Sequence, residues 1–200
     1  WFWITNPLVR LFIALHLTPN ILTFIGVLIS FIAGILFWRG QFGLAGWIMI
    51  FAATFDMFDG RVARATGQTT RSGAYFDAVM DRVSEGVVFI GLALYYLDQL
   101  LVLLLVMLTL IGSYMVSYTR AKGEAMGVAY QGGSMQRPER IVYLGLGAVF
   151  APLVVWIICQ FMPGFSFDLY LLPLGFVGVM TWVTSIERIR TIMRRLDQAA

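Results

Sequence analysis

The chain has 200 residues, of which 60% are hydrophobic and only 12% are charged. Soluble domains carry about twice that share of charged residues, and a core of this size cannot bury so much apolar surface. The composition therefore excludes a soluble enzyme and a disordered chain. The single Lys and thirteen Arg are spread along the chain, without the compact basic patch that is typical of nucleic-acid-binding proteins.

The chain begins with a segment that mixes aromatic, aliphatic and basic residues. Residues 1–16 combine Trp, Phe and Leu with Arg10 and His16, and Pro19 follows. Such a mixture is typical of an amphipathic helix that lies on the membrane interface. We therefore expect an interfacial helix over residues 1–18.

Six later stretches are long and apolar enough to cross a bilayer, which takes about 20 residues per helix. They cover approximately residues 21–38, 44–64, 73–97, 100–118, 141–161 and 169–186. The sequence thus predicts an all-α integral membrane protein, with an N-terminal interfacial helix and six transmembrane helices. We expect one domain over residues 1–200, with the transmembrane bundle at residues 19–195.

Basic residues are shared unequally between the two sets of predicted helix ends. Twelve of the fourteen lie at one set, whereas Arg39 lies at the other and Arg82 falls within a helix. Because positively charged loops stay on the cytoplasmic side, both termini are predicted to be cytoplasmic. We expect a multi-pass protein of the cell membrane.

Four aspartates interrupt the second and third predicted spans near their cytoplasmic ends. Asp56 and Asp59 are three residues apart, and Asp77 and Asp81 are four apart, so each pair shares one helix face. The short link at residues 65–72 makes the two helices neighbours, and the two acidic faces can then converge. Because unpaired charges are costly inside a membrane, four of them indicate a function.

A divalent cation would remove the repulsion among these carboxylates. Carboxylate oxygens are hard ligands that suit Mg²⁺, Mn²⁺ or Ca²⁺. Membrane acids also line proton and cation pathways, so a divalent-cation transporter is an alternative. A pathway predicts acids spread across the bilayer, whereas here they gather at one end.

Small residues accompany the acids and leave room for a ligand or for close helix packing. Gly60 follows Asp59 directly, and Ala63 lies one turn further on. Arg64 comes next, where its side chain can hold a phosphate oxygen at the membrane surface.

Together these residues form one run, Asp56-x2-Asp59-Gly60-x2-Ala63-Arg64-x8-Gly73-x3-Asp77-x3-Asp81. This run resembles, residue for residue, the signature of the CDP-alcohol phosphotransferase family. The resemblance covers nearly the whole chain, since six spans with the signature across the second and third are also the family's architecture. It implies transfer of a substituted phosphate from a CDP-linked donor to an alcohol, with release of CMP.

The resemblance also implies roles for individual residues. Two divalent ions, Mg²⁺ or Mn²⁺, would be held by Asp56, Asp59, Asp77 and Asp81, and Asp81 would deprotonate the acceptor hydroxyl. The donor, CDP-diacylglycerol or CDP-archaeol, would lie against Asn20, Gly60, Ala63, Arg64 and Thr70. Family members are often homodimers, and the same is implied here.

The acceptor has to be inferred from polar clusters outside this run, at residues 117–124, 132–140 and 187–188. Several arginines facing one pocket suit an acceptor that carries a phosphate, because Arg binds phosphate through two parallel hydrogen bonds. A phosphorylated polyol is therefore a better candidate than serine. The more C-terminal Arg190, Arg194 and Arg195 are better explained by contact with anionic membrane lipids.

These clusters are similar to those of the phosphatidylinositol-phosphate synthase branch and its archaeal relatives. The branch uses inositol 1-phosphate, held by three basic residues that correspond by position to Arg120, Arg140 and Arg188, with Arg137 beside them. Arg120 and Lys122 exchange the branch's Lys and Arg, so positive charge is kept. A phosphatidylglycerol-phosphate synthase using glycerol 3-phosphate is the nearest alternative.

Overall fold

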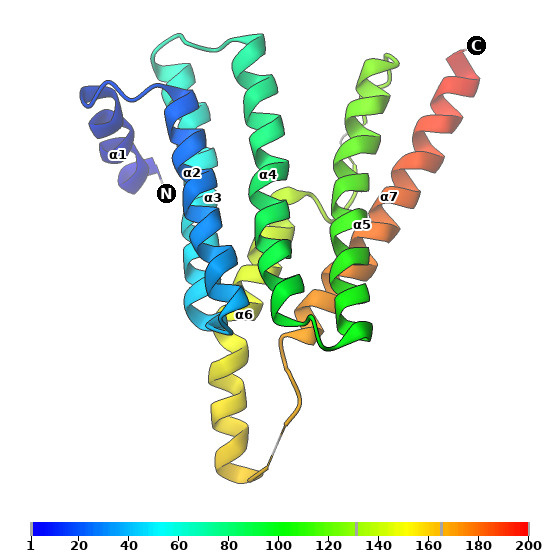
Figure 1. The fold of residues 1–200 in the computed structure, drawn as a ribbon. Helices are drawn as coiled ribbons and strands as arrows, with labels where there is room; N and C mark the ends of the chain where they lie inside the picture. The colour runs from blue at the N-terminus through cyan, green and yellow to red at the C-terminus, as the bar shows by residue number, and fades with distance from the viewer. Residues whose placement is uncertain (1, 131, 165, 200) are drawn as a thin grey trace.

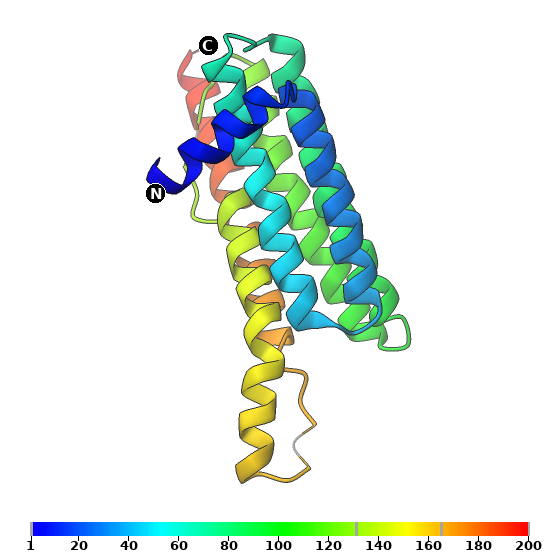
Figure 2. The same cartoon turned by 90° about the vertical axis from the view of Figure 1, so that its left-hand side faces the viewer.

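The computed structural model describes residues 2–130, 132–164 and 166–199. Within these ranges the chain forms seven α-helices and no strand: α1 (Phe2–Ala14), α2 (Pro19–Trp38), α3 (Phe42–Ala65), α4 (Arg71–Tyr95), α5 (Leu100–Ala125), α6 (Arg137–Phe161) and α7 (Leu171–Ala199). The six helices α2–α7 form a bundle, and α1 lies at an angle to them near one end, where it packs on α3 (Figures 1 and 2). The all-α prediction is confirmed.

Two threonines begin the helices that frame the acidic residues. The Thr18 side chain accepts a hydrogen bond from the backbone N–H of Ile21, and Pro19 follows in the first turn of α2. In the same way, the Thr70 hydroxyl accepts from the backbone N–H of Gly73 at 3.0 Å and caps α4. Both residue types favour helix starts, and both starts lie at the end of the bundle where α3 finishes (Figure 1).

Glycines bring neighbouring helices into close contact. Helix α2 packs against α3 and α4, α3 against α6, and α5 against α7. A Cβ added at Gly91 of α4 would lie only 2.0 Å from the carbonyl oxygen of Gly34 of α2. Near this contact, buried side chains such as Phe37, Phe89 and Leu92 form the main apolar core. The core thus fixes α4 beside α2 away from the acidic end.

Four helices in the described ranges are long and apolar enough to cross a membrane: α2, α3, α5 and α6. The chain is therefore a multi-pass membrane protein. Helices α4 and α7 have 25 and 29 residues, but their charged residues make them more polar. The predicted set of six transmembrane helices and an interfacial helix is thus confirmed only in part.

The connection between α5 and α6 differs most from the sequence-based prediction. Helix α5 continues to Ala125 instead of ending near residue 118, and α6 begins at Arg137 instead of near residue 141. The chain between them turns back along the bundle, so α6 starts at mid-depth and extends past the other helices at the far end (Figures 1 and 2). Arg137 and Arg140 therefore lie on a helix that packs on α3, and their side chains reach α4.

Candidate active site

The four aspartates lie on α3 and α4 near the end where α3 finishes and α4 begins. Asp59 is 5% exposed, and the other three are partly buried. They lie close enough for mutual repulsion, which links Asp56 to Asp77 and Asp81, and Asp59 to Asp77. The structure therefore brings the two acidic faces together, as the spacing predicted.

A cavity of about 500 Å³ opens on one side of these acids, a size usual for ligand pockets. Asp59 and Asp77 form part of its wall. The wall also contains every residue predicted to contact the CDP-linked donor, namely Asn20, Gly60, Ala63, Arg64 and Thr70. We call this space the donor cavity. The Arg64 guanidinium lies close to Gly60: a Cβ added at Gly60 would be 3.4 Å from its Nη1.

A second cavity, of about 460 Å³, lies on the other side of the acids. We call it the acceptor cavity. Asp77 and Asp81 line it together with all four arginines predicted to bind the acceptor phosphate, which come from α5, α6 and α7: Arg120, Arg137, Arg140 and Arg188. Asp77 lines both cavities, so the two spaces meet at this residue, whereas Asp56 lines neither of them.

The arginines of the acceptor cavity differ in their partners. Arg188 is 2% exposed and donates to the backbone carbonyls of Gly132 and Val116, at 2.7 and 2.6 Å. These carbonyls orient the guanidinium but bring no full negative charge. Arg120, by contrast, is half-exposed and pairs with Glu124 at 3.0 Å. Arg188 is thus better placed than Arg120 to attract an anion.

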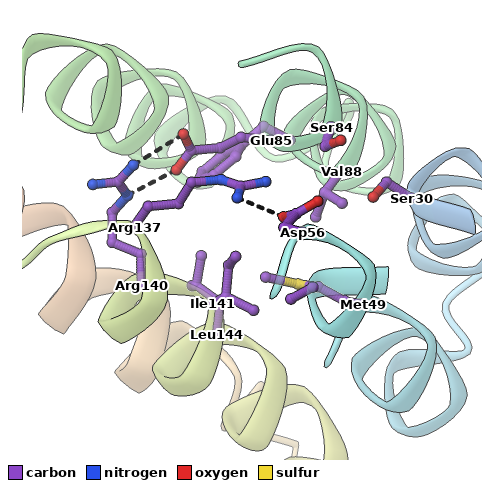
Figure 3. A pocket seen from close by; sticks show the side chains of 12 residues that line it. Ser30, Met49, Asp56, Ser84, Glu85, Val88, Arg137, Arg140, Ile141 and Leu144 are labelled. Atoms are coloured by element: carbon purple, nitrogen blue, oxygen red, sulfur yellow. Dashed lines mark hydrogen bonds and ion pairs between the residues drawn. The ribbon is translucent and has the colours of Figure 1, made fainter. Parts of the chain in front are cut away.

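Arg140 is buried and already neutralised by a carboxylate. Its Nε and Nη2 donate to the two carboxylate oxygens of Glu85 at 2.8 and 3.1 Å (Figure 3). Its Nη1 donates to the Met135 carbonyl. This two-pronged pairing holds α6 to α4. It leaves Arg140 with less capacity for a phosphate than the sequence-based prediction assumed.

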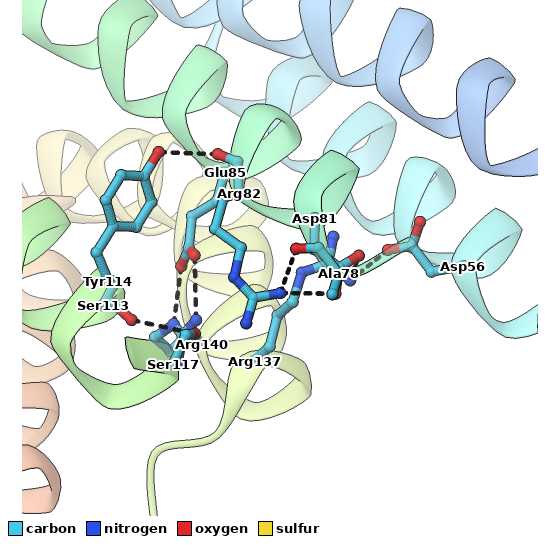
Figure 4. Close-up of polar contacts among 10 residues, drawn as sticks. All are labelled: Asp56, Ala78, Asp81, Arg82, Glu85, Ser113, Tyr114, Ser117, Arg137 and Arg140. Carbon is cyan, nitrogen blue, oxygen red and sulfur yellow. Dashed lines mark hydrogen bonds and ion pairs between the residues drawn. The ribbon is translucent and has the colours of Figure 1, made fainter. Parts of the chain in front are cut away.

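Arg137 contacts the acidic residues themselves. Its Nη1 lies 2.5 Å from Oδ2 of Asp56 and 2.7 Å from Oδ1 of Asp81, and it therefore joins α3 to α4 (Figure 4). Asp81 also lies 3.7 Å from the Arg82 guanidinium. Of the four predicted acceptor-binding arginines, Arg137 is the one that this structure pairs with the predicted metal ligands.

Comparison with known proteins identifies the chain. The profile of the CDP-alcohol phosphatidyltransferase family matches residues 16–186. The chain belongs to this family. It is 36% identical to the phosphatidylinositol phosphate synthase of Mycobacterium tuberculosis over 197 residues, which cover 94% of this chain and 85% of the relative. It is 35% identical to the archaetidylinositol phosphate synthase of Pyrococcus horikoshii over 185 residues, covering 92% and 88%.

Solved structures agree with this membership. The fold matches the M. tuberculosis phosphatidylinositol phosphate synthase with CDP-DAG bound, with a TM-score of 0.81, 30% identity, and coverage of 94% of this chain and 93% of that one. A structure of the same enzyme with manganese and citrate matches with a TM-score of 0.82 at 29% identity, covering 94% and 88%. This CDP-alcohol phosphatidyltransferase is thus an enzyme, as the resemblance predicted.

The four aspartates of this phosphatidyltransferase fit a hard divalent cation, because their carboxylates supply only oxygen ligands. In the described residues, however, no three acidic, His or Cys side chains are gathered tightly enough to form a ready-made metal site. The carboxylates repel one another, and the Arg137 guanidinium lies between Asp56 and Asp81. The sequence predicted that the two acidic pairs face each other. It did not predict that an arginine lies between Asp56 and Asp81.

Two residues of the site make contacts that the sequence analysis did not predict. Thr23 of α2 is 3% exposed, and its hydroxyl donates to Oδ2 of Asp59 at 2.5 Å. Glu85 follows Asp81 by one helical turn and pairs with Arg140. That four-residue spacing places Glu85 on the acidic face of α4, which was the signal available in the sequence.

Proposed function

We propose that this phosphatidyltransferase transfers a phosphatidyl-type group from a CDP-linked lipid to inositol 1-phosphate, giving phosphatidylinositol phosphate and CMP. One observation carries the proposal: an arginine-lined cavity meets the donor cavity at Asp77. The relatives named above are phosphatidylinositol phosphate and archaetidylinositol phosphate synthases, and one related structure holds CDP-DAG. Their names support an inositol phosphate acceptor over glycerol 3-phosphate.

In this proposal the donor cavity holds the CDP moiety. Asn20 and Thr70 lie at the starts of α2 and α4, which frame the cavity. Gly60 and Ala63 have small side chains and leave space in the cavity for the ligand. Arg64 lies above Gly60, where its guanidinium can bind a phosphate oxygen of the donor. The lipid tails of CDP-diacylglycerol or CDP-archaeol stay in the bilayer.

The metal ligands in this proposal are Asp56, Asp59, Asp77 and Asp81, and the ions are two Mg²⁺ or Mn²⁺. When bound, such ions offset the negative charge of the diphosphate. Manganese in a related structure supports this choice of metal. Thr23 orients the Asp59 carboxylate through its hydrogen bond, as outer residues of metal sites commonly do.

The transfer itself takes place where the two cavities meet. An acceptor hydroxyl oxygen bonds to the lipid-bearing phosphorus, the bond from that phosphorus to the CMP oxygen breaks, and Asp81 takes the hydroxyl proton. Asp81 lines the acceptor cavity, as this role requires. Arg188 and Arg120 bind the acceptor phosphate, and Arg140 supports them from its pair with Glu85.

The proposal includes a membrane arrangement. All six helices α2–α7 cross the bilayer as one domain, α1 lies on the cytoplasmic interface, and the active site and both termini face the cytoplasm. The basic residues that end α3, α5 and α7 lie at one end of the bundle, which supports this orientation (Figure 1). The enzyme works as a homodimer among membrane lipids and has no nucleic-acid partner.

An acceptor screen tests the proposal. Purified protein receives CDP-diacylglycerol and Mn²⁺ with inositol 1-phosphate, glycerol 3-phosphate or serine, and CMP release is measured. We expect release with inositol 1-phosphate far above the other two. Release with glycerol 3-phosphate alone would establish the alternative acceptor, and no release with any acceptor or CDP-lipid would refute the reaction.

A further inference from the structure

Arg137 connects three helices through one guanidinium. It stands at the start of α6, and its Nη1 lies 2.5 Å from Asp56 on α3 and 2.7 Å from Asp81 on α4. The three side chains are only 16–19% exposed. Salt and water screen such partly buried pairs less than surface pairs. Loss of the guanidinium would therefore leave Asp56 and Asp81 without their counter-charge and destabilise this end of the bundle.

The same carboxylates are proposed to hold the metal. A divalent ion binds carboxylate oxygens at about 2.0–2.6 Å, but Oδ2 of Asp56 and Oδ1 of Asp81 already face the guanidinium nitrogen. Two cations at one pair of carboxylates also repel each other. An ion that uses both aspartates must therefore compete with Arg137 for them.

Arg137 has a place to move when it gives up these contacts. It lines the acceptor cavity, and its Nε is a buried donor without a hydrogen-bond acceptor among the described residues. The long arginine side chain can turn into that cavity without unwinding the start of α6. The acids can thus exchange one cation for another while the helices stay in place.

We infer that Arg137 is a built-in counter-cation of the metal site, which stabilises the acids before an ion binds and is displaced from Asp56 and Asp81 when it does. The inference rests on the proposed metal site. It sets Arg137 apart from Arg120, which lines the same cavity but pairs with Glu124. Loss of Arg137 should therefore have opposite effects on metal affinity and on metal-free stability.

The experiment compares wild type, Arg137→Gln and Arg120→Gln as full-length purified protein. Mn²⁺ affinity is measured by isothermal titration calorimetry, and thermal unfolding is measured in EDTA. We expect Arg137→Gln to bind Mn²⁺ about tenfold more tightly, a change usual for coupled binding events, and to unfold at a lower temperature without metal. Arg120→Gln removes the same charge from the cavity and should change Mn²⁺ affinity by less than about threefold.

The outcomes separate this inference from the proposed function. Wild type that binds no Mn²⁺ would overturn the metal site and the inference together. Wild type that binds Mn²⁺, with Arg137→Gln binding it equally or more weakly, would overturn the inference alone. If Arg137→Gln does not fold, Arg137→Met replaces it, because it also removes the positive charge and keeps a long side chain with apolar packing. Mn²⁺ affinity that does not rise in the Met variant would also overturn the inference.

Discussion

The buried pair between Glu85 and Arg140 gives the sharpest prediction about stability. Arg140 is 1% exposed and Glu85 10%, and two hydrogen bonds of 2.8 and 3.1 Å join them. Removing one partner of a buried pair leaves an uncompensated charge and costs about 3–5 kcal/mol. Glu85→Gln keeps an amide oxygen that can accept one bond, so we expect a loss near 3 kcal/mol, at the lower end of that range.

Thermal unfolding in detergent measures this loss. For a chain of this length a loss near 3 kcal/mol corresponds to a fall in Tm of about 6–12 °C. Glu124→Gln is the matched control, because it breaks the exposed pair with Arg120, whose partners are 41% and 44% exposed. Such surface pairs contribute only about 0–1 kcal/mol.

A double variant checks the physical reason. Glu85→Gln combined with Arg140→Met removes the stranded charge, so most of the lost stability should return even though acceptor binding suffers. The reasoning would be refuted if the Tm of Glu85→Gln fell no further than the Tm of Glu124→Gln. It would be refuted equally if the double variant unfolded at the same temperature as Glu85→Gln alone.

Three further variants test the acceptor cavity, the metal site and the fold. Arg188→Met should raise the KM for the phosphorylated acceptor by about 10–100-fold, because it removes charge-assisted hydrogen bonds, and a comparable rise in the donor KM would reassign Arg188. Thr23→Val removes the hydroxyl that donates to Asp59 and should weaken Mn²⁺ binding by about tenfold; unchanged affinity in a calorimetric titration would exclude that role. Gly91→Ala places a methyl group against α2 and should destabilise the bundle by about 1–3 kcal/mol, whereas Gly175→Ala, with open space around its Cβ, should unfold near the wild-type temperature.

The convergence of the acidic residues follows from local sequence features. Spacings of three and four residues place each pair on one face of its helix. The connection between α3 and α4 is short, and the Thr70 cap fixes where α4 begins. Helix α2 packs on both α3 and α4 and holds the two acidic faces toward each other, and the spacing of the acids does not predict this intermediary role.

The contacts of Arg137 and Arg140 depend on the path of the chain from α5 to α6. Helix α5 ends where Gly127 takes a positive φ of 81°, and the Val128 N–H bonds back to the Gly123 carbonyl at 2.9 Å. The chain then returns to mid-depth before α6 begins (Figure 2). Local periodicity carries no information about that depth, so these pairings with α3 and α4 could not be predicted.

The count of membrane spans illustrates a related limit. The carboxylates on α4 and the arginines on α7 lower the hydropathy of these helices below that of α2 and α5. The acids that mark the candidate site thus also weaken the membrane signal of the helix that carries them.

Metal-dependent CMP release by wild type and by the variants Asp56→Asn, Asp59→Asn, Asp77→Asn and Asp81→Asn tests the central claim most directly. Wild type should release CMP with Mn²⁺ or Mg²⁺ and stop in EDTA. Asp81→Asn should lose at least about 100-fold in turnover, the usual minimum for losing a general base, and should still bind the CDP-lipid. The other three variants should lose about as much, because each removes a ligand of the catalytic metal ions. Near wild-type turnover in any of the four, or undiminished release in EDTA, would contradict a shared metal site at the junction of the two cavities.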